Sequence, residues 1–265
     1  MKLPLLFLSL SIINYLMNPE ELHFDNAPSI ETIFLIRSSS IKEMSLEDFE
    51  NKALEIIDNN FNEKRIIRFN DVKFRANDAE MMDVHSTSGW LGIEFRDTEK
   101  QFVLRLQKDG LSFHKLKPYT SFTDILPQMK ELWRKYCEVF QPAGVSKIGL
   151  RFVNRIELPN DVTAENLSDY LSVVPHVKLP SETDIKNVLS RVHVESNELN
   201  GYISFSNVST IQPNIEAVIL DIDTWQDQDL SASNQSIWSN FSELRTFKNK
   251  LFLESLTKKC LTLFN

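Results

Sequence analysis

The stretch KIGLRFVNRIELP, residues 147–159, carries the side chains of this chain that are best suited to bind a charged ligand. Alternate residues of a strand point to opposite faces, so Lys147, Arg151 and Arg155 share one face. Arg151 and Arg155 would stand about 13 Å apart at ordinary strand rise. Guanidinium groups arranged in a row bind phosphates and carboxylates. We therefore predict an anion-binding or partner-binding face formed by Arg151, Arg155 and Lys147.

The same stretch has a plainer interpretation. Arginines on strands are commonly neutralised by acidic side chains of adjacent strands, and Glu94 and Glu216 are candidates for that role. Asn154 lies on the other, apolar face of the strand, where a buried amide needs hydrogen-bond partners. We interpret Asn154 as a structural polar residue that bonds to neighbouring backbone.

The run DIDTWQDQD, residues 221–229, offers a second kind of chemistry. Asp221 and Asp223 lie on one face of an expected strand, and Asp227 and Asp229 follow in an expected loop. Paired carboxylates at a strand end can hold Mg²⁺, so a metal-dependent hydrolase or nuclease is an alternative function. A third ligand at a defined spacing is missing from the sequence, which favours a solvated acidic turn and no metal site.

Most motif-based chemistry is missing from the sequence. The five histidines form no HxH, HxxxH or HExxH pair, and no GxGxxG, GxxxxGK[ST] or GxSxG pattern occurs. The two cysteines, Cys137 and Cys260, are too few for a disulfide scaffold or a cysteine-rich zinc site. We predict free thiols in a reducing, cytoplasmic compartment, no catalytic residue and no cofactor.

The charge balance bears on possible partners. The chain has a formal net charge of −8, and acidic proteins repel nucleic acid because phosphate contacts need Lys and Arg. Nucleic-acid binding through Arg151 and Arg155 is therefore less favoured than a binding or regulatory role with another partner, and less favoured than the metal-dependent hydrolase or nuclease.

The N-terminal segment MKLPLLFLSLSIINYLM, residues 1–17, is a separate feature. Its apolar run has the length of a signal-peptide core, but it is short and interrupted by polar residues for a membrane span. A signal peptide, an interfacial anchor and an upstream extension before a start at Met17 are all compatible with it, and we favour the last. We expect no membrane contact unless this segment is retained.

The periodicity of apolar residues predicts an alternation of strands and helices. The first half is expected to hold strands at 30–37, 66–74, 90–95, 101–107 and 111–116, helices at 45–61 and 121–140, and a loop at 77–88. The second half is expected to hold strands at 147–158, 187–196, 201–208 and 215–223, and helices at 163–173 and 235–264.

This order predicts an α+β protein with an antiparallel sheet and long helices on one face. Residues 26–265 are expected to form a single domain that contains two pseudo-repeats, 26–142 and 145–265. The order within each half is similar to that of TATA-binding-protein-like folds. That comparison concerns architecture alone and implies no function.

Several segments resemble one protein family. The run KIGLRFVNRI resembles the signature R-x-G-x-R-[YF]-[IV]-N-R-I of a sporadically distributed, uncharacterised prokaryotic family, with Lys147 in place of its leading Arg. APSIETIFLIR resembles the family's opening strand, Trp133 and Tyr136 stand where its members carry aromatics, and FLESLTKKCLTLF resembles its closing element, with Thr257 at the Thr position. The resemblance covers the chain after about Asn26, leaves out residues 1–17, and implies no reaction. The family's sporadic distribution suggests mobile or defence-related loci.

The leading functional hypothesis is a cytoplasmic α+β binding or regulatory protein without enzymatic activity. Its partner is expected to be a protein or an anionic ligand. The expected contact surface is the strand face of Arg151 and Arg155, together with part of the helix at 121–140.

Overall fold

The computed structural model describes residues 22, 24–39, 41–76, 82–174, 187–208 and 214–264, with side chains described outside 72–85. The predicted N-terminal extension, residues 1–17, lies outside the described residues. Within them, nine strands form one antiparallel sheet in the order β2-β3-β4-β5-β1-β6-β9-β8-β7. The strands are β1 (Ser29–Ser38), β2 (Glu63–Ala76), β3 (Met82–Asp97), β4 (Phe102–Gln107), β5 (Gly110–Leu116), β6 (Gly144–Glu157), β7 (Leu189–Ser196), β8 (Leu199–Val208) and β9 (Ala217–Ser231). The protein therefore combines a large antiparallel sheet with helices, as the sequence predicts at that level.

The strand order relates the two halves of the chain. β1 and β6, the first strand of each half, pair at the centre of the sheet. The later strands of the first half follow outwards from β1 as β5, β4, β3 and β2, and those of the second half follow outwards from β6 as β9, β8 and β7. In each half, the last strand in sequence therefore lies next to the first.

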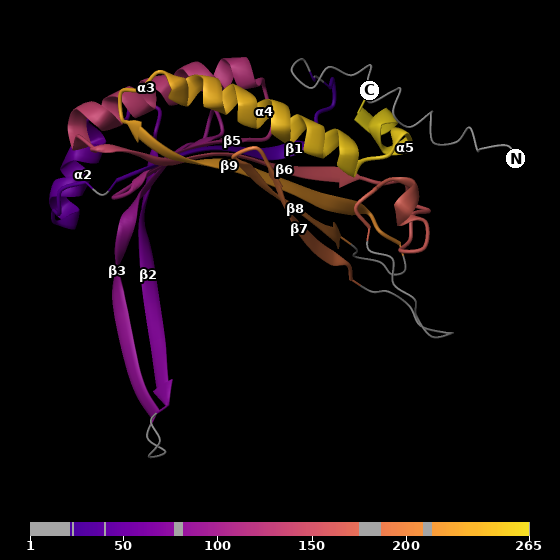
Figure 1. The fold of residues 1–265 in the computed structure, drawn as a ribbon, viewed down its shortest axis with the longest axis horizontal. Helices are drawn as coiled ribbons and strands as arrows, with labels where there is room; N and C mark the ends of the chain where they lie inside the picture. Colours follow the sequence, from indigo (N-terminus) through magenta and orange to yellow (C-terminus); the bar gives the residue numbers. More distant parts are fainter. Residues whose placement is uncertain are drawn as a thin grey trace, which may run out of the picture.

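The helices are gathered on one face of this sheet. α3 (Phe122–Phe140) and α4 (Ser236–Ser255) run across it, and α2 (Leu46–Leu54) lies at one end (Figure 1). Two single-turn 3₁₀ segments, Leu167–Asp169 and Thr262–Phe264, and the short helix α5 (Lys258–Leu261) complete the helical elements of the described residues. Ser121 begins α3 as its N-cap, because its side-chain oxygen accepts a hydrogen bond from the backbone N–H of Asp124.

The core lies between the helices and the sheet. Phe34 of β1, Phe113 of β5 and Leu150 of β6 pack there with Tyr136 of α3 and Phe241 of α4. A second cluster lies under the C-terminal half of α4 and includes residues of β8, β9 and the C-terminal segment, namely Phe205, Leu220, Phe252, Leu256 and Phe264. Apolar residues alternate along β1, β6 and β9 because only one face of the sheet is covered.

Three predicted boundaries are wrong. Residues 82–88 of the predicted loop 77–88 belong to β3, which forms with β2 a two-stranded ribbon that projects beyond the helix-covered part of the sheet (Figure 1). The predicted helix 45–61 ends at Leu54. The predicted helix 235–264 breaks at Leu256, because Thr257 caps a new helix there with its side-chain oxygen.

Two further segments differ from the prediction. The segment 163–173 contains only the 3₁₀ turn at 167–169. β9 continues to Ser231, so Asp227 and Asp229 lie in a strand and not in a loop. Among the described residues, no helix combines the length and apolar composition that a membrane span requires.

Candidate functional site

The sheet face opposite α3 and α4, which we call the open face, carries a network of charged side chains. The register places Arg65, Glu94, Arg105 and Ser112 side by side on β2, β3, β4 and β5. The neighbouring row contains His114, Ile33, Arg151, Asp223 and Tyr202, on β5, β1, β6, β9 and β8. Directly opposed residues of an antiparallel pair share a face, so these side chains from distant parts of the sequence meet on the open face.

Glu94 anchors the first part of this network. Its side chain is buried, and its two carboxylate oxygens accept hydrogen bonds of 2.8 Å from Nε of Arg96 and Nε of Arg105. Burial alone would raise the pKa of Glu94, but the bonds from Arg105 and Arg96 outweigh it and lower the pKa. Glu94 is therefore an ionised carboxylate that holds two guanidinium groups in place.

A second part is the chain of hydrogen bonds that joins Ser112, His114 and Glu31. Ser112 Oγ lies 2.9 Å from His114 Nε2, and His114 Nδ1 lies 2.8 Å from Glu31 Oε1. Burial lowers the pKa of His114, although Glu31 opposes this, and the bond from His114 lowers the pKa of Glu31. The neutral imidazole consequently donates from Nδ1 to the Glu31 carboxylate and accepts the Ser112 hydroxyl at Nε2.

This connectivity is that of a nucleophile, a base and a residue that orients the base. Ester hydrolysis also needs donors for the oxyanion that develops. Ser112 lies in a strand that pairs on both sides, with β4 and with β1, so its neighbourhood offers no pair of free backbone N–H groups. Within the described residues, the chain therefore fixes the orientation of His114 and Ser112 and lacks a backbone oxyanion site.

Arg151, the central residue of the predicted binding face, lies on the open face. Its Nε and Nη2 atoms donate to the two carboxylate oxygens of Asp221, at 2.8 and 2.6 Å. The side chain of Arg151 is 43% exposed and that of Asp221 is 22% exposed. The carboxylate that neutralises Arg151 is thus Asp221, and neither Glu94 nor Glu216 has that role. Both partners keep contact with solvent.

The other predicted residues have separate surroundings. Arg155 donates from Nε to Glu157 on its own strand at 2.6 Å. The Lys147 ammonium lies 4.4 Å from the ring centroid of Trp225. Asn154 is buried on the helix side and donates from Nδ2 to the backbone oxygen of Leu220 at 3.0 Å. These contacts agree with the structural interpretation of Asn154, and they place Arg151 and Lys147, but not Arg155, beside the charged network.

Asp221 and Asp223 share the open face, as the alternation predicts. Burial raises the pKa of Asp223, and Arg151 opposes that effect only in part. Both oxygens of Asp221 are occupied by Arg151. Among the described side chains, no group of three His, Cys, Asp or Glu is placed to hold a metal ion. His23 and His176 lie outside the described residues, and so does the side chain of His85.

A concavity of about 530 Å³ lies in the open face between β2, β4, β5, β1 and β6. Its wall holds five arginines, Arg37, Arg65, Arg68, Arg105 and Arg151, and two carboxylates, Glu94 and Asp223. Two of the arginines are neutralised by carboxylates just outside the wall, since Arg37 pairs with Asp109 and Arg151 with Asp221. Arg65 and Arg68 are exposed and form no ion pair with any described residue.

An aromatic cluster extends the open face towards the other end of the sheet. The ring centroids of His193 and Tyr202 lie 4.9 Å apart, and those of Tyr202 and Trp225 lie 5.0 Å apart. The Arg191 guanidinium lies 3.8 Å from the Tyr202 ring and the Lys147 ammonium lies on Trp225. Rings and cations are therefore interleaved from β7 to β6.

No family model matches the chain, and no curated protein matches it either. The resemblance carried by KIGLRFVNRI accordingly stays a prediction.

Sequence reasoning found Arg151 but missed most of the concavity, and Lys147 does not line it. Arg68 and Arg105 lie on two expected strands, and Arg65 directly precedes the first of them; the sequence does not reveal which strands pair with these two. Ser112 and His114 could have been placed on one face by their spacing of two, but Glu31 joins them only through the pairing of β5 with β1. The missing information is the order of strands in the sheet.

Proposed function

We propose that the protein is a non-enzymatic binding or regulatory protein that takes an anionic group of a ligand or partner into the open-face concavity. The observation that supports this is the concentration of five arginines around one hollow, in a chain of net charge −8, with Arg65 and Arg68 unpaired among the described residues. A cluster of arginines on a protein of negative net charge creates a local positive potential that attracts phosphates and carboxylates.

The arginines would have different roles in such binding. Arg105 is held by Glu94 and Arg151 by Asp221, so these two guanidinium groups are oriented before a ligand arrives. Arg65 and Arg68 have no carboxylate partner among the described residues and would supply the charge that the ligand neutralises. Held donors lose little conformational freedom on binding, and unpaired ones gain the most from it.

The test uses pyrophosphate as a probe anion and isothermal titration calorimetry at low ionic strength. An Arg65→Gln, Arg68→Gln double variant should bind it roughly 10- to 100-fold more weakly than the native protein, because a hydrogen bond to a charged group is worth about 1.5–3 kcal/mol. Arg134→Gln is the matched control, since Arg134 lies on α3 and pairs there with Glu131 and Glu138. Equal affinity of the double variant and the native protein would contradict the proposal.

A second candidate function is binding of single-stranded nucleic acid, and the aromatic cluster supports it. Bases stack on aromatic rings beside cations, and each stacked base contributes roughly 1–3 kcal/mol. Tyr202 and Trp225 lie on the same face as Arg151 and Lys147. Fluorescence anisotropy with a labelled single strand should then give salt-dependent binding that Trp225→Ala weakens at least tenfold. Binding that Trp225→Ala leaves unchanged would remove this candidate.

The metal-dependent alternative requires a rearrangement of the acidic side chains on β9. Asp221 would have to release Arg151 in order to coordinate a cation together with Asp223. Nuclease activity with Mg²⁺ or Mn²⁺ that is lost in an Asp221→Ala, Asp223→Ala double variant would support it. Activity that persists in this variant would end it.

The remaining features of the proposal concern origin and compartment. The matching strand order on the two sides of the β1–β6 pair supports pseudo-repeats at 26–142 and 145–265, in a TATA-binding-protein-like order with long helices on one face. The free thiols of Cys137 and Cys260 support a reducing, cytoplasmic compartment. The resemblance to the sporadically distributed prokaryotic family would make this a protein of mobile or defence-related loci.

A further inference from the structure

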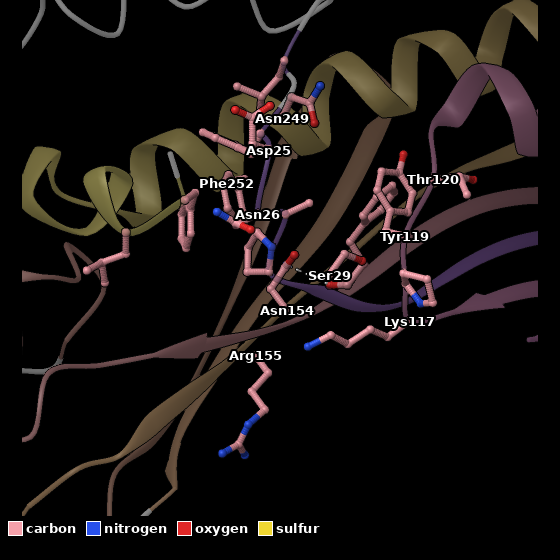
Figure 2. Close-up of a pocket in the computed structure, with 18 of the residues that line it drawn as sticks. Asp25, Asn26, Ser29, Lys117, Tyr119, Thr120, Asn154, Arg155, Asn249 and Phe252 are labelled. Carbon is pink, nitrogen blue, oxygen red and sulfur yellow. Dashed lines mark hydrogen bonds between the residues drawn. The ribbon is translucent and has the colours of Figure 1, made fainter.

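A second cavity lies on the other side of the sheet, between β6, the start of β1 and α4. Its volume is about 480 Å³. In Figure 2, Asn154, Ser29, Tyr119 and Phe252 surround this space, whereas Arg155 points to the opposite side of the strand. This cavity is thus separated from the open-face concavity by the sheet itself.

Lys248 of α4 lines this cavity and is the least expected side chain in it. Only 7% of the residue is exposed, and its ammonium lies 3.7 Å from the centroid of the Phe152 ring. No described residue forms a hydrogen bond or an ion pair with its Nζ atom. A buried lysine normally pairs with a carboxylate or with several acceptors, and here the only close partner is an aromatic ring.

The other charged groups near Lys248 do not compensate its charge. The other ionisable groups of the wall are Asp25, Lys117, Tyr119, Arg155, Glu157 and Arg245. Arg155 is paired with Glu157, and Arg245 stands one helical turn before Lys248. Burial, with Arg245 adding to it, lowers the pKa of Lys248 to about 7. Apart from the Arg155–Glu157 pair, the wall holds three basic residues, Lys117, Arg245 and Lys248, against Asp25, so it is basic even though the whole chain is acidic.

The apolar part of the wall determines the shape and polarity of the uncharged part of a ligand. Phe24, Phe252 and Phe264 form one ring cluster, with the Phe24 and Phe264 centroids 5.2 Å apart. The backbone N–H of Asn26 donates to the oxygen of Phe264 at 3.1 Å, which joins the chain before β1 to the C-terminal segment. A cavity with aromatic rings on one side and a single buried ammonium on the other suits a molecule with an apolar body and one charged end.

We propose that this cavity is a binding site for a small carboxylic acid with an aromatic or branched apolar body, whose carboxylate pairs with the Lys248 ammonium. The buried Lys248 ammonium matches a monoanion, whereas a phosphate dianion would need more buried donors than the surroundings of Lys248 provide. The apolar body packs against Phe24, Phe252 and Phe264. The ligand supplies the carboxylate that the protein itself does not place beside Lys248.

The experiment compares phenylacetate with phenylacetamide, which has nearly the same shape but no charge. Binding is measured by isothermal titration calorimetry at pH 8 in two buffers of different ionisation enthalpy. Phenylacetate should bind at least tenfold more tightly than phenylacetamide. It should also take up a proton, because a paired carboxylate raises the pKa of the ammonium.

Two variants assign the effect to Lys248. Lys248→Met keeps the length of the buried side chain and should abolish both the preference for the carboxylate and the proton uptake. Lys250→Met, an exposed lysine on the same helix that lies outside this cavity, should leave both unchanged.

A direct measurement covers the case in which Lys248→Met perturbs the fold. Reductive ¹³C-methylation of the native protein labels the lysines, and the Lys248 signal, assigned by its absence in the variant, should move its titration midpoint upwards when phenylacetate is added. The proposal is overturned if phenylacetate and phenylacetamide bind alike, if phenylacetate does not bind, or if the Lys248 signal titrates identically with and without it. Loss of pyrophosphate binding at the open face would not alter any of these results, so the two proposals fail separately.

Discussion

Replacement of Lys248 by methionine should stabilise the protein at neutral pH, and the gain should fall as the pH rises. The pKa of Lys248 is lowered from its ordinary 10.5 to about 7. One pKa unit corresponds to 1.36 kcal/mol, so holding the charged lysine in the folded state costs roughly 5 kcal/mol below pH 7. Methionine is uncharged and of similar length, and a buried charge replaced by an apolar side chain commonly stabilises a fold.

The pH dependence follows from proton counts. Between pH 7 and 10.5 the unfolded chain keeps the Lys248 proton and the folded protein has released it. Stability of the native protein therefore gains about 1.4 kcal/mol per pH unit from this group as the pH rises. The variant lacks this gain, so its advantage is full below pH 7, shrinks between pH 7 and 10.5, and ends above that.

The assay is urea-induced unfolding of both proteins at intervals between pH 6 and 10, with tryptophan fluorescence as the signal. The free energy of unfolding of the native protein is subtracted from that of the variant at each pH. Other groups, such as the thiols of Cys137 and Cys260, are common to both proteins and cancel in this difference. Lys250→Met is the control and should give a difference near zero at every pH. A Lys248→Met difference that does not change with pH would refute the reasoning, because it would mean that Lys248 is solvated or paired in the folded protein.

Three further predictions concern other parts of the molecule. Gly110→Ala should destabilise the protein by roughly 2 kcal/mol or more, as chemical denaturation would measure. Gly110 has a φ of +131°, and an added Cβ would lie 2.0 Å from the backbone oxygen of Ile36. Asp221→Asn should lower stability by at most about 1 kcal/mol, since the Arg151–Asp221 pair is partly exposed. The same substitution should strengthen pyrophosphate binding, because it releases Arg151. Weaker binding would contradict a role of Arg151 in the concavity. Ser121→Ala should cost about 1 kcal/mol through the lost N-cap of α3, and Ser121→Asp should restore the melting temperature.

The elements that pack against the core were predictable, because burial leaves a period in the sequence. β6 is the clearest case: Ile148, Leu150, Phe152, Asn154 and Ile156 are all buried, as the alternation of residues predicts. The β2–β3 ribbon was missed for the opposite reason. It extends beyond the helix-covered part of the sheet, so neither face needs apolar residues, and a segment such as DVHSTSG reads as a loop. The end of β9 was shortened because its outer face carries the exposed Asp227 and Asp229, and DQD reads as a loop.

Lys248 was overlooked because a single lysine in a helix normally lies on the solvent side. One signal was nevertheless present. Phe241, Leu244 and Phe252 form the buried stripe of α4, and position 248 falls on the same stripe at helical spacing. A charged residue inside an apolar stripe is expensive to bury, and it could have been marked as a candidate site from the sequence alone.

The two sides of the sheet present cations in different states, and this difference decides what each can bind. On the open face, Arg105 and Arg151 are already neutralised by Glu94 and Asp221. An incoming anion can compete with Asp221 for Arg151 at little cost, since partly exposed pairs are worth about 1 kcal/mol or less. Glu94 is buried and keeps Arg105, so the added affinity comes from Arg65 and Arg68. Under α4, Lys248 has no competitor to displace. A carboxylate that enters there pairs with a buried charge that the fold leaves uncompensated, so this single contact should discriminate strongly between an acid and its amide. At the open face, the discrimination should be spread over several arginines and should weaken as the salt concentration rises.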